Sequence, residues 1–432
     1  MLQASIEAIS GRRTILYSML VALLFTALVV AWSLMIPFNG APDESTHFFL
    51  VDYLYAYGKV PSPGIDPAVP FISPLSGVAI SKERFWYYGL PYLHSLGAAA
   101  TAHLFADFFP LHNGYLAVRA FNWLLAPVFA ISLLAIAAMV GMRGAIYFLA
   151  PIAFLLVPQL TFLFSYFNAD AFALTATTLA LALMLWAFRR PHSLRPLLFG
   201  LGCGLVMSSK IYFYPSLVFF AVYIAYQYLV DRSFPIIRFC LMAIAAAAAI
   251  ALPVLGTTYL EFGEFTGLKG QVAFTAMHIS AKTMSCFIFC SDKLIDVANT
   301  TWWLFMAGRS FFYGLGWMNV WLSDGFYSFF FFPIVAAILV VSVLYSAYSL
   351  IRYRIDGLEA FRIPLMTLLF WGMTISVILL NIIGSQMLLP QPQGRYLYVA
   401  FPFAAFLVFS MLSRVHGQRL TSARTTRGSV VT

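Results

Sequence analysis

Three side chains able to carry protons or bind metal ions stand together in the segment IPFNGAPDESTHFFLVDYLYAYG: Asp43, Glu44 and His47, directly after a long apolar run. Pro42 favours a helix start here, and acids in a first helical turn are stabilised by the helix dipole. A carboxylate at a membrane surface is desolvated on one side, which raises its proton affinity toward the range of a general base. We predict Asp43, or else Glu44, as a catalytic base. An acid that caps an interfacial helix is the alternative.

A metal ion is a second use for this segment. Glu44 and His47 are three residues apart, so one helical face could present both to a divalent cation. Two ligands make an incomplete site. The sequence therefore predicts no resident cofactor, and a divalent metal stays an open alternative with these two residues as its candidate ligands.

Further polar residues stand at the ends of other apolar runs, in SYFNADAFAL, SSKIYFYP, the segment GRSFFYG and PQPQGRYLYV. A cation at a membrane edge is a functional candidate, here as a clamp for a phosphate. The predicted substrate-binding residues are His47, Asn168, Asp170, Lys210, Arg309, Arg395 and Tyr396. A helix cap is the alternative for the pair Asn168 and Asp170, and a snorkelling side chain is the alternative for Lys210.

The elements that must position these residues are long apolar helices. Of the 432 residues, 62% are hydrophobic and 9% charged, whereas soluble domains carry about 25% charged residues. Continuous apolar runs of roughly 20 residues predict membrane-spanning helices and not the short alternating strands of a β-barrel. The first run is too long for a signal peptide. We predict an all-α polytopic membrane protein with about ten spans, at 14–36, 115–140, 145–165, 170–188, 196–209, 211–230, 236–258, 326–350, 362–384 and 396–413.

The basic residues predict the orientation of these spans. The net charge of +9 does not indicate nucleic-acid binding, because the arginines cluster in the short connections between apolar runs. With the stretches 85–109 and 301–322 lying at the membrane interface, alternate connections and the tail collect most arginines on one side. By the positive-inside rule that side is the cytoplasm, and both termini lie there. Asp43, Asp170 and Arg395 then face outward.

These assignments give one domain over 1–413, whose outer loops 37–114 and 259–325 carry interfacial helices, and a basic tail over 414–432 predicted to be disordered. No internal repeat is visible. Cys203 and Cys240 lie in apolar runs and are predicted core residues. Cys286 and Cys290 are close enough in sequence that a strained disulfide stays open.

Four motifs carry a resemblance over most of the chain, from Pro37 to about Pro402: APDESTHF, FNADAFAL, RSFFYGLGWMNVWLSDGFY and PQGRYLYVAFP. In this order they resemble a family of bacterial polytopic proteins of unassigned activity that is similar to the GT-C superfamily, the membrane glycosyltransferases that use polyprenyl-phosphate sugars. The resemblance implies that Asp43, with Glu44 behind it, is the base, and that Asp170 is a second acid. The chain departs from many GT-C members because it has no large soluble C-terminal domain.

The function implied is transfer of a sugar from a polyprenyl-phosphate donor to a hydroxyl of an envelope glycan, lipid or protein, outside the bacterial cytoplasmic membrane. Direct displacement would invert the anomeric centre. A transporter or flippase of lipid-linked glycans is the first alternative, although it predicts repeats and polar residues near mid-membrane. A non-catalytic membrane scaffold, whose outer acids would be dispensable, is the second.

Overall fold

The computed structural model describes residues 2–60, 71–77, 79–80, 90–270, 297–316, 319–351, 357–387 and 393–428. The predicted pair Cys286 and Cys290, and the arginines Arg352 and Arg354, lie outside these ranges. Within them, regular structure is helical apart from a hairpin in which β1 (Phe71–Ile72) pairs antiparallel with β2 (Ala79–Ile80). The predicted all-α class is confirmed.

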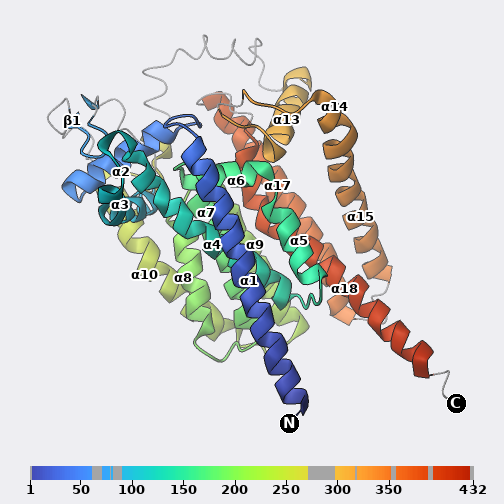
Figure 1. The fold of residues 1–432 in the computed structure, drawn as a ribbon. Helices are drawn as coiled ribbons and strands as arrows, with labels where there is room; N and C mark the ends of the chain where they lie inside the picture. Colours follow the sequence, from blue (N-terminus) through green and yellow to red (C-terminus); the bar gives the residue numbers. More distant parts are fainter. Residues whose placement is uncertain are drawn as a thin grey trace.

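The helices follow one another along the chain (Figure 1). The first half contains α1 (Leu2–Met35), α2 (Glu44–Tyr57), α3 (Leu93–Phe105), α4 (Tyr115–Met139), α5 (Ile146–Leu155), α6 (Pro158–Ser165), α7 (Ala169–Phe188) and α8 (Arg195–Met207). The second half contains α9 (Pro215–Val230), α10 (Ile236–Phe262), α13 (Val297–Phe312), α14 (Asp324–Phe326), α15 (Phe332–Ile351), α17 (Arg362–Met387) and α18 (Phe401–Gly428), with a 3₁₀ helix, η7 (Gly394–Ala400), before α18.

The multi-pass architecture is confirmed, and the number of spans differs slightly from the prediction. Among the described residues, eight helices are long and apolar enough to cross a membrane, or nine if the bent pair α5 and α6 counts as one span. The remaining predicted span, 196–209, forms the 13-residue α8. The stretches 85–109 and 301–322, predicted to lie at the membrane interface, overlap α3 and α13, and neither helix is among the candidate spans.

The predicted span 145–165 is broken instead of straight. Its two halves, α5 and α6, meet at an angle of 62°. Val157 has an extended backbone (ψ 116°) and Pro158 occupies the first turn of α6. Because the proline ring crowds the preceding residue out of the helical region, the helix ends there and a new one begins.

Short α8 packs between α7 and α10 by close approach of the backbones. A Cβ atom on Gly200 would lie 2.2 Å from the carbonyl oxygen of Ala243, and one on Gly204 would lie 2.8 Å from that of Ala247. Because these two glycines, four residues apart, have no side chains, α10 can pack directly against the α8 backbone. Small residues commonly allow such close helix packing inside membranes.

The two termini lie at one end of the bundle, and α2, α3 and α13 lie at the other (Figure 1). We call these the terminal end and the distal end. At the terminal end, the Ser413 hydroxyl of α18 donates a 2.8 Å hydrogen bond to the Val140 carbonyl that follows α4. Helix α18 continues to Gly428, through the tail predicted to be disordered. A helix already started by an apolar span extends at little cost, because nucleation is the expensive step.

Helix α2 starts close to Pro42, where the sequence favours a helix start. It begins at Glu44 and ends at Tyr57, and the following Gly58 adopts a left-handed conformation (φ 65°) and donates its N–H to the Leu54 carbonyl. Most of α2 is buried, including Phe48, Leu50 and Val51. The helix is therefore packed into the distal end, and its first turn is held in a fixed place relative to the spans.

Candidate active site

Asp43 lies between the end of α1 and the first turn of α2, with a left-handed backbone (φ 63°, ψ 3°). Residues other than glycine seldom adopt this region, which makes it a place where strain is stored at functional sites. Its side chain makes no cap hydrogen bond to α2, in contrast to the capping alternative. It pairs instead with the guanidinium of Arg395, and 31% of the Asp43 side chain stays exposed.

The tight packing of η7 against α13 positions Arg395. The Gly394 N–H donates a 2.6 Å hydrogen bond to the Ser310 hydroxyl. A Cβ atom on Gly394 would lie 2.1 Å from the Phe311 nitrogen and 2.4 Å from the Ala307 carbonyl oxygen. Only glycine fits this contact, which sets the direction in which the next residue leaves the turn. Arg395 is consequently buried, with 5% of its side chain exposed.

A second acid and a second base complete the charged group. Asp170, in the first turn of α7, accepts a 2.9 Å hydrogen bond from the Lys210 ammonium. The other Asp170 oxygen lies 3.8 Å from Nε of Arg395. Lys210 and Arg395, which are far apart in sequence, therefore meet at one carboxylate. We call Asp43, Asp170, Lys210 and Arg395 the distal charge cluster.

Tyrosines border this cluster on the side of the two bases. The Lys210 nitrogen lies 4.9 Å from the ring centre of Tyr396 and 5.9 Å from that of Tyr212. The two rings contact each other with centroids 4.7 Å apart. Cation–π attraction of this kind stabilises a partly desolvated ammonium. Tyr396 thus lies at the cluster, as predicted, and Tyr212 is a neighbour that the sequence did not single out.

His47 lies one turn into α2, buried behind Asp43. Its ring packs edge-on against His94 of α3, with centroids 5.7 Å apart, and against Phe167 at 6.3 Å. Burial lowers the pKa of His47 to about 4, against the opposing influence of Asp43, so the imidazole is neutral near pH 7. Its Nδ1 atom has no hydrogen-bond partner among the described residues.

Arg395 also sets the charge state of Asp43. Burial is the largest single influence on this carboxyl and opposes its ionisation, but the charge and the hydrogen bond of Arg395, together with smaller contributions that include the charge of Lys210, outweigh burial and hold the pKa of Asp43 below its usual value. Asp43 is therefore an ionised, partly exposed acid on a strained backbone.

Glu44, the other predicted base, points away from this cluster toward Arg119 of α4. The Arg119 Nε and Nη2 atoms donate to its two oxygens at 2.6 and 2.7 Å. The remaining Arg119 hydrogens reach the carbonyls that end α1: Ser33 at 2.6 Å, Ile36 at 2.7 Å and Pro37 at 3.1 Å. All five donors of the guanidinium are used.

The Glu44 carboxylate is equally occupied. It also accepts from the backbone nitrogen of Asn39 at 2.9 Å and of Phe167 at 3.3 Å, and 1% of its side chain is exposed. A base needs a free lone pair that a substrate proton can reach. This geometry argues against a catalytic role for Glu44 and against the metal site with His47. No group of three or more potential metal ligands occurs within the described ranges.

The sequence did not predict the role of Arg119. It lies inside the predicted span 115–140 and is fully buried. A charged side chain within a span is paired or functional as a rule, and this signal could have identified it.

Asn168 takes the alternative role that the sequence offered. Its side-chain oxygen accepts from the Ala171 nitrogen at 2.9 Å and caps α7. Its amide donates to the carbonyls of Leu163 at 2.6 Å and Tyr166 at 2.9 Å. These bonds use the side chain to shape the turn that carries Asp170, so we assign Asn168 to positioning and not to substrate binding.

Arg309 joins a different group on α13 and α14. Its Nη2 atom lies 2.8 Å from Asp324, and its guanidinium stacks on Tyr327 at 4.6 Å and Trp321 at 5.0 Å. None of its described contacts involves the distal charge cluster, which differs from the predicted share in phosphate binding.

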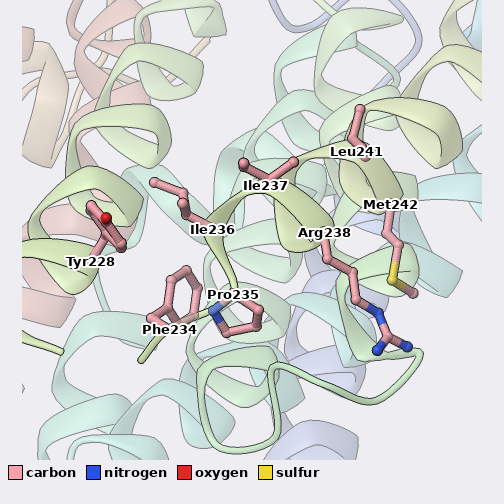
Figure 2. Close-up of a pocket in the computed structure, with 8 residues that line it drawn as sticks. All are labelled: Tyr228, Phe234, Pro235, Ile236, Ile237, Arg238, Leu241 and Met242. Atoms are coloured by element: carbon pink, nitrogen blue, oxygen red, sulfur yellow. The ribbon is translucent and has the colours of Figure 1, made fainter. Parts of the chain in front are cut away.

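A pocket of about 730 Å³ lies at the terminal end, where α9 is followed by α10 (Figure 2). Tyr228 and Phe234 lie on one side of it, and Arg238 and Met242 on the other. None of its eight described lining residues is an acid, so it lacks the acid–base pairing of the distal cluster.

Comparison of the chain with protein families, with curated proteins and with solved structures finds no match.

Proposed function

We propose that the protein transfers a sugar from a polyprenyl-phosphate donor to an acceptor hydroxyl, at the outer face of the bacterial cytoplasmic membrane. One observation carries the proposal: a partly exposed carboxylate, Asp43, pairs with a buried cation, Arg395, and Asp170 links Arg395 to a second, half-buried cation, Lys210, at one end of a multi-pass membrane bundle. The gathering of arginines toward the terminal end supports an outward-facing distal end.

In this proposal, the donor tail lies between helices and its phosphate contacts Arg395 and Lys210. Both cations lie in surroundings with little water, where they stabilise negative charge better than they would in bulk solvent. Negative charge grows on the phosphate as the bond between it and the anomeric carbon breaks. The two cations therefore favour departure of the polyprenyl phosphate.

Asp43 receives the proton of the acceptor hydroxyl while the hydroxyl oxygen forms the new bond to the anomeric carbon. The electron pair of the broken bond leaves with the phosphate. The products are the glycosylated acceptor and a polyprenyl phosphate, with inversion at the anomeric carbon. Neutral His47 offers a hydrogen-bonding group beside Asp43, and Tyr396 flanks the phosphate.

Purified protein in liposomes, supplied with radiolabelled polyprenyl-phosphate sugars and an envelope fraction as acceptor, tests the proposal. We expect label to move to the envelope fraction, and Asp43→Asn to slow this about 10²- to 10⁴-fold, the usual loss when a general base is removed. Asp107→Asn changes the same charge on an exposed residue and should keep full activity. No transfer by the unaltered protein with any donor, or full transfer by Asp43→Asn, would overturn the proposal.

A further inference from the structure

Arg395 is shared between two carboxylates. Its guanidinium pairs with Asp43 and lies 3.8 Å from Asp170, which also binds Lys210. Two acids and two bases give the distal charge cluster no formal net charge. An arriving phosphate would add negative charge to a group that is already balanced, so its binding at Arg395 is opposed unless one carboxylate gives way.

The two carboxylates differ in how firmly they are held. Asp170 is buried, with 2% of its side chain exposed, and Lys210 holds it from a second direction. Asp43 is 31% exposed, and Arg395 is its one side-chain partner among the described residues. Its backbone lies in a left-handed conformation. Asp43 can turn toward water without leaving a buried charge, whereas Asp170 cannot.

We propose that Asp43 occupies the anion site of Arg395 in the resting protein, and that a polyprenyl phosphate ester displaces it and thereby frees it to act as the base. The inference rests on the function proposed above and adds its regulation. Phosphate oxygens match the paired donors of a guanidinium, so the ester and the carboxylate compete for the same cation.

The competition has a chemical consequence. While Arg395 holds Asp43, the carboxylate is a weak base. Once the ester takes over the guanidinium, that attraction is lost and the proton affinity of Asp43 rises. The base thus becomes effective when the donor is in place, and an empty site does not activate water or an acceptor by itself.

Removal of the competing carboxylate should therefore tighten phosphate binding while it slows transfer about 10²- to 10⁴-fold. We would measure the binding of farnesyl phosphate to detergent-solubilised protein by calorimetry. Asp43→Asn should bind about two- to fivefold more tightly, the range expected for loss of one partly exposed charge contact. Asn tolerates a left-handed backbone, and Asp43→Gly, which also fits it, is a second variant without the carboxylate. Thermal unfolding would verify that both variants are folded.

Three controls decide the interpretation. Asp107→Asn should leave the affinity for farnesyl phosphate unchanged. In an Arg395→Gln background, Asp43→Asn should no longer tighten binding, because the shared partner is gone. Farnesol, which lacks the phosphate, should bind all variants alike.

Inorganic phosphate identifies which part of the ester competes with Asp43. Tighter binding of inorganic phosphate as well would support the proposal and identify the phosphate alone as the competitor. Tighter binding of farnesyl phosphate only would support the proposal for a lipid ester.

Unchanged or weaker binding of farnesyl phosphate by both Asp43 variants would overturn the inference, as would equal tightening for farnesol. Because no sugar is transferred in this measurement, its outcome is separate from the proposed activity. If the Asp43 variants bind farnesyl phosphate more tightly but the unaltered protein transfers no sugar, the displacement of Asp43 is supported and the transferase function is contradicted. If transfer depends on Asp43 but the Asp43 variants do not bind farnesyl phosphate more tightly, the transferase function is supported and the displacement is contradicted.

Discussion

Asp43 and Glu44 are adjacent acids with opposite surroundings. Glu44 is closed in by Arg119 and two backbone nitrogens, with 1% of its side chain exposed. Asp43 has one side-chain partner among the described residues, and 31% of it is exposed. The difference teaches that an acid is available for chemistry according to how many of its lone pairs the fold has already used.

The two acids also depend on each other. Arg119 ties Glu44 to the end of α1 through the carbonyls of Ser33, Ile36 and Pro37. The pair therefore fixes both sides of the short loop that contains Asp43. The fully hydrogen-bonded pair of Glu44 and Arg119 is thus a rigid support for Asp43, the side chain that moves in the proposed displacement.

Arg119→Ala should have the largest effect on stability. It leaves the Glu44 charge and three carbonyls buried without their donor, and breaking a buried pair in this way costs about 3–5 kcal/mol. Urea or thermal unfolding in detergent would measure the loss. Arg119→Lys should also destabilise, because three donors on one nitrogen cannot reach the acceptors that a planar guanidinium reaches.

Arg395→Ala is the matched comparison for that experiment. Asp170 keeps Lys210 and Asp43 keeps contact with water, so this substitution should cost clearly less than Arg119→Ala. Equal losses of unfolding free energy for the two arginine variants would contradict the distinction between the buried pair of Arg119 with Glu44 and the partly exposed pair of Arg395 with Asp43.

Asp52→Asn should have an intermediate effect on stability. Asp52 is a third acid of the same segment and extends the comparison of Asp43 with Glu44. Asp52 is fully buried and accepts a 3.3 Å hydrogen bond from the Leu75 nitrogen. Burial, only partly offset by Ser73 and Leu75, raises the pKa of Asp52 from 3.8 to about 6. The folded protein thus holds this proton more tightly than the unfolded chain, and the free energy of unfolding falls as the pH rises through that window.

This shift corresponds to about 3 kcal/mol of destabilisation above pH 6. The uncharged amide of the variant would avoid this destabilisation. Asp52→Asn should therefore unfold at a higher temperature than the unaltered protein at pH 8, and the difference in unfolding temperature should disappear toward pH 4. A gap that is constant with pH would show that ionisation of Asp52 is not its cause. The contribution of His47, which has the opposite sign, cancels in this difference.

Asp43→Asn should have the smallest effect on stability, about 1 kcal/mol or less, since a partly exposed ion pair contributes little. Thermal unfolding at pH 7, with Asp107→Asn as the control, would measure it. A loss of stability as large as that of Arg119→Ala would show that Asp43 is needed to hold the fold together. That result would contradict the proposal that Asp43 can leave Arg395.

The sequence was sufficient for the order of the spans, the start of α2 and the presence of Asp43, Asp170, Lys210 and Arg395 at one end. Hydrophobic runs and alternate arginine-rich connections are local signals, and a chain that crosses a membrane repeatedly has only two ends at which to place its loops. The bend between α5 and α6 was not predicted, although Pro158 is a local signal for it.

The distinction between Asp43 and Glu44 was not predictable in the same way. Both acids share one local sequence, and their roles depend on whether Arg119 or Arg395, 75 and 352 residues away, reaches them. Such pairing is decided by the packing of α1, α4 and η7. The double role of Asn, as a cap or as a ligand, was likewise settled for Asn168 by contacts with the preceding turn.

The shortness of α8 has a consequence for the acceptor. Its 13 residues extend roughly 20 Å at 1.5 Å per residue, about 10 Å less than a hydrocarbon core. Lys210, which follows its distal end, is therefore expected at acyl-chain depth and not at the water surface. In the proposed reaction, an acceptor would have to bring its hydroxyl down into the membrane to reach the sugar, so we expect bulky soluble glycans to be excluded in favour of slender or lipid-anchored chains.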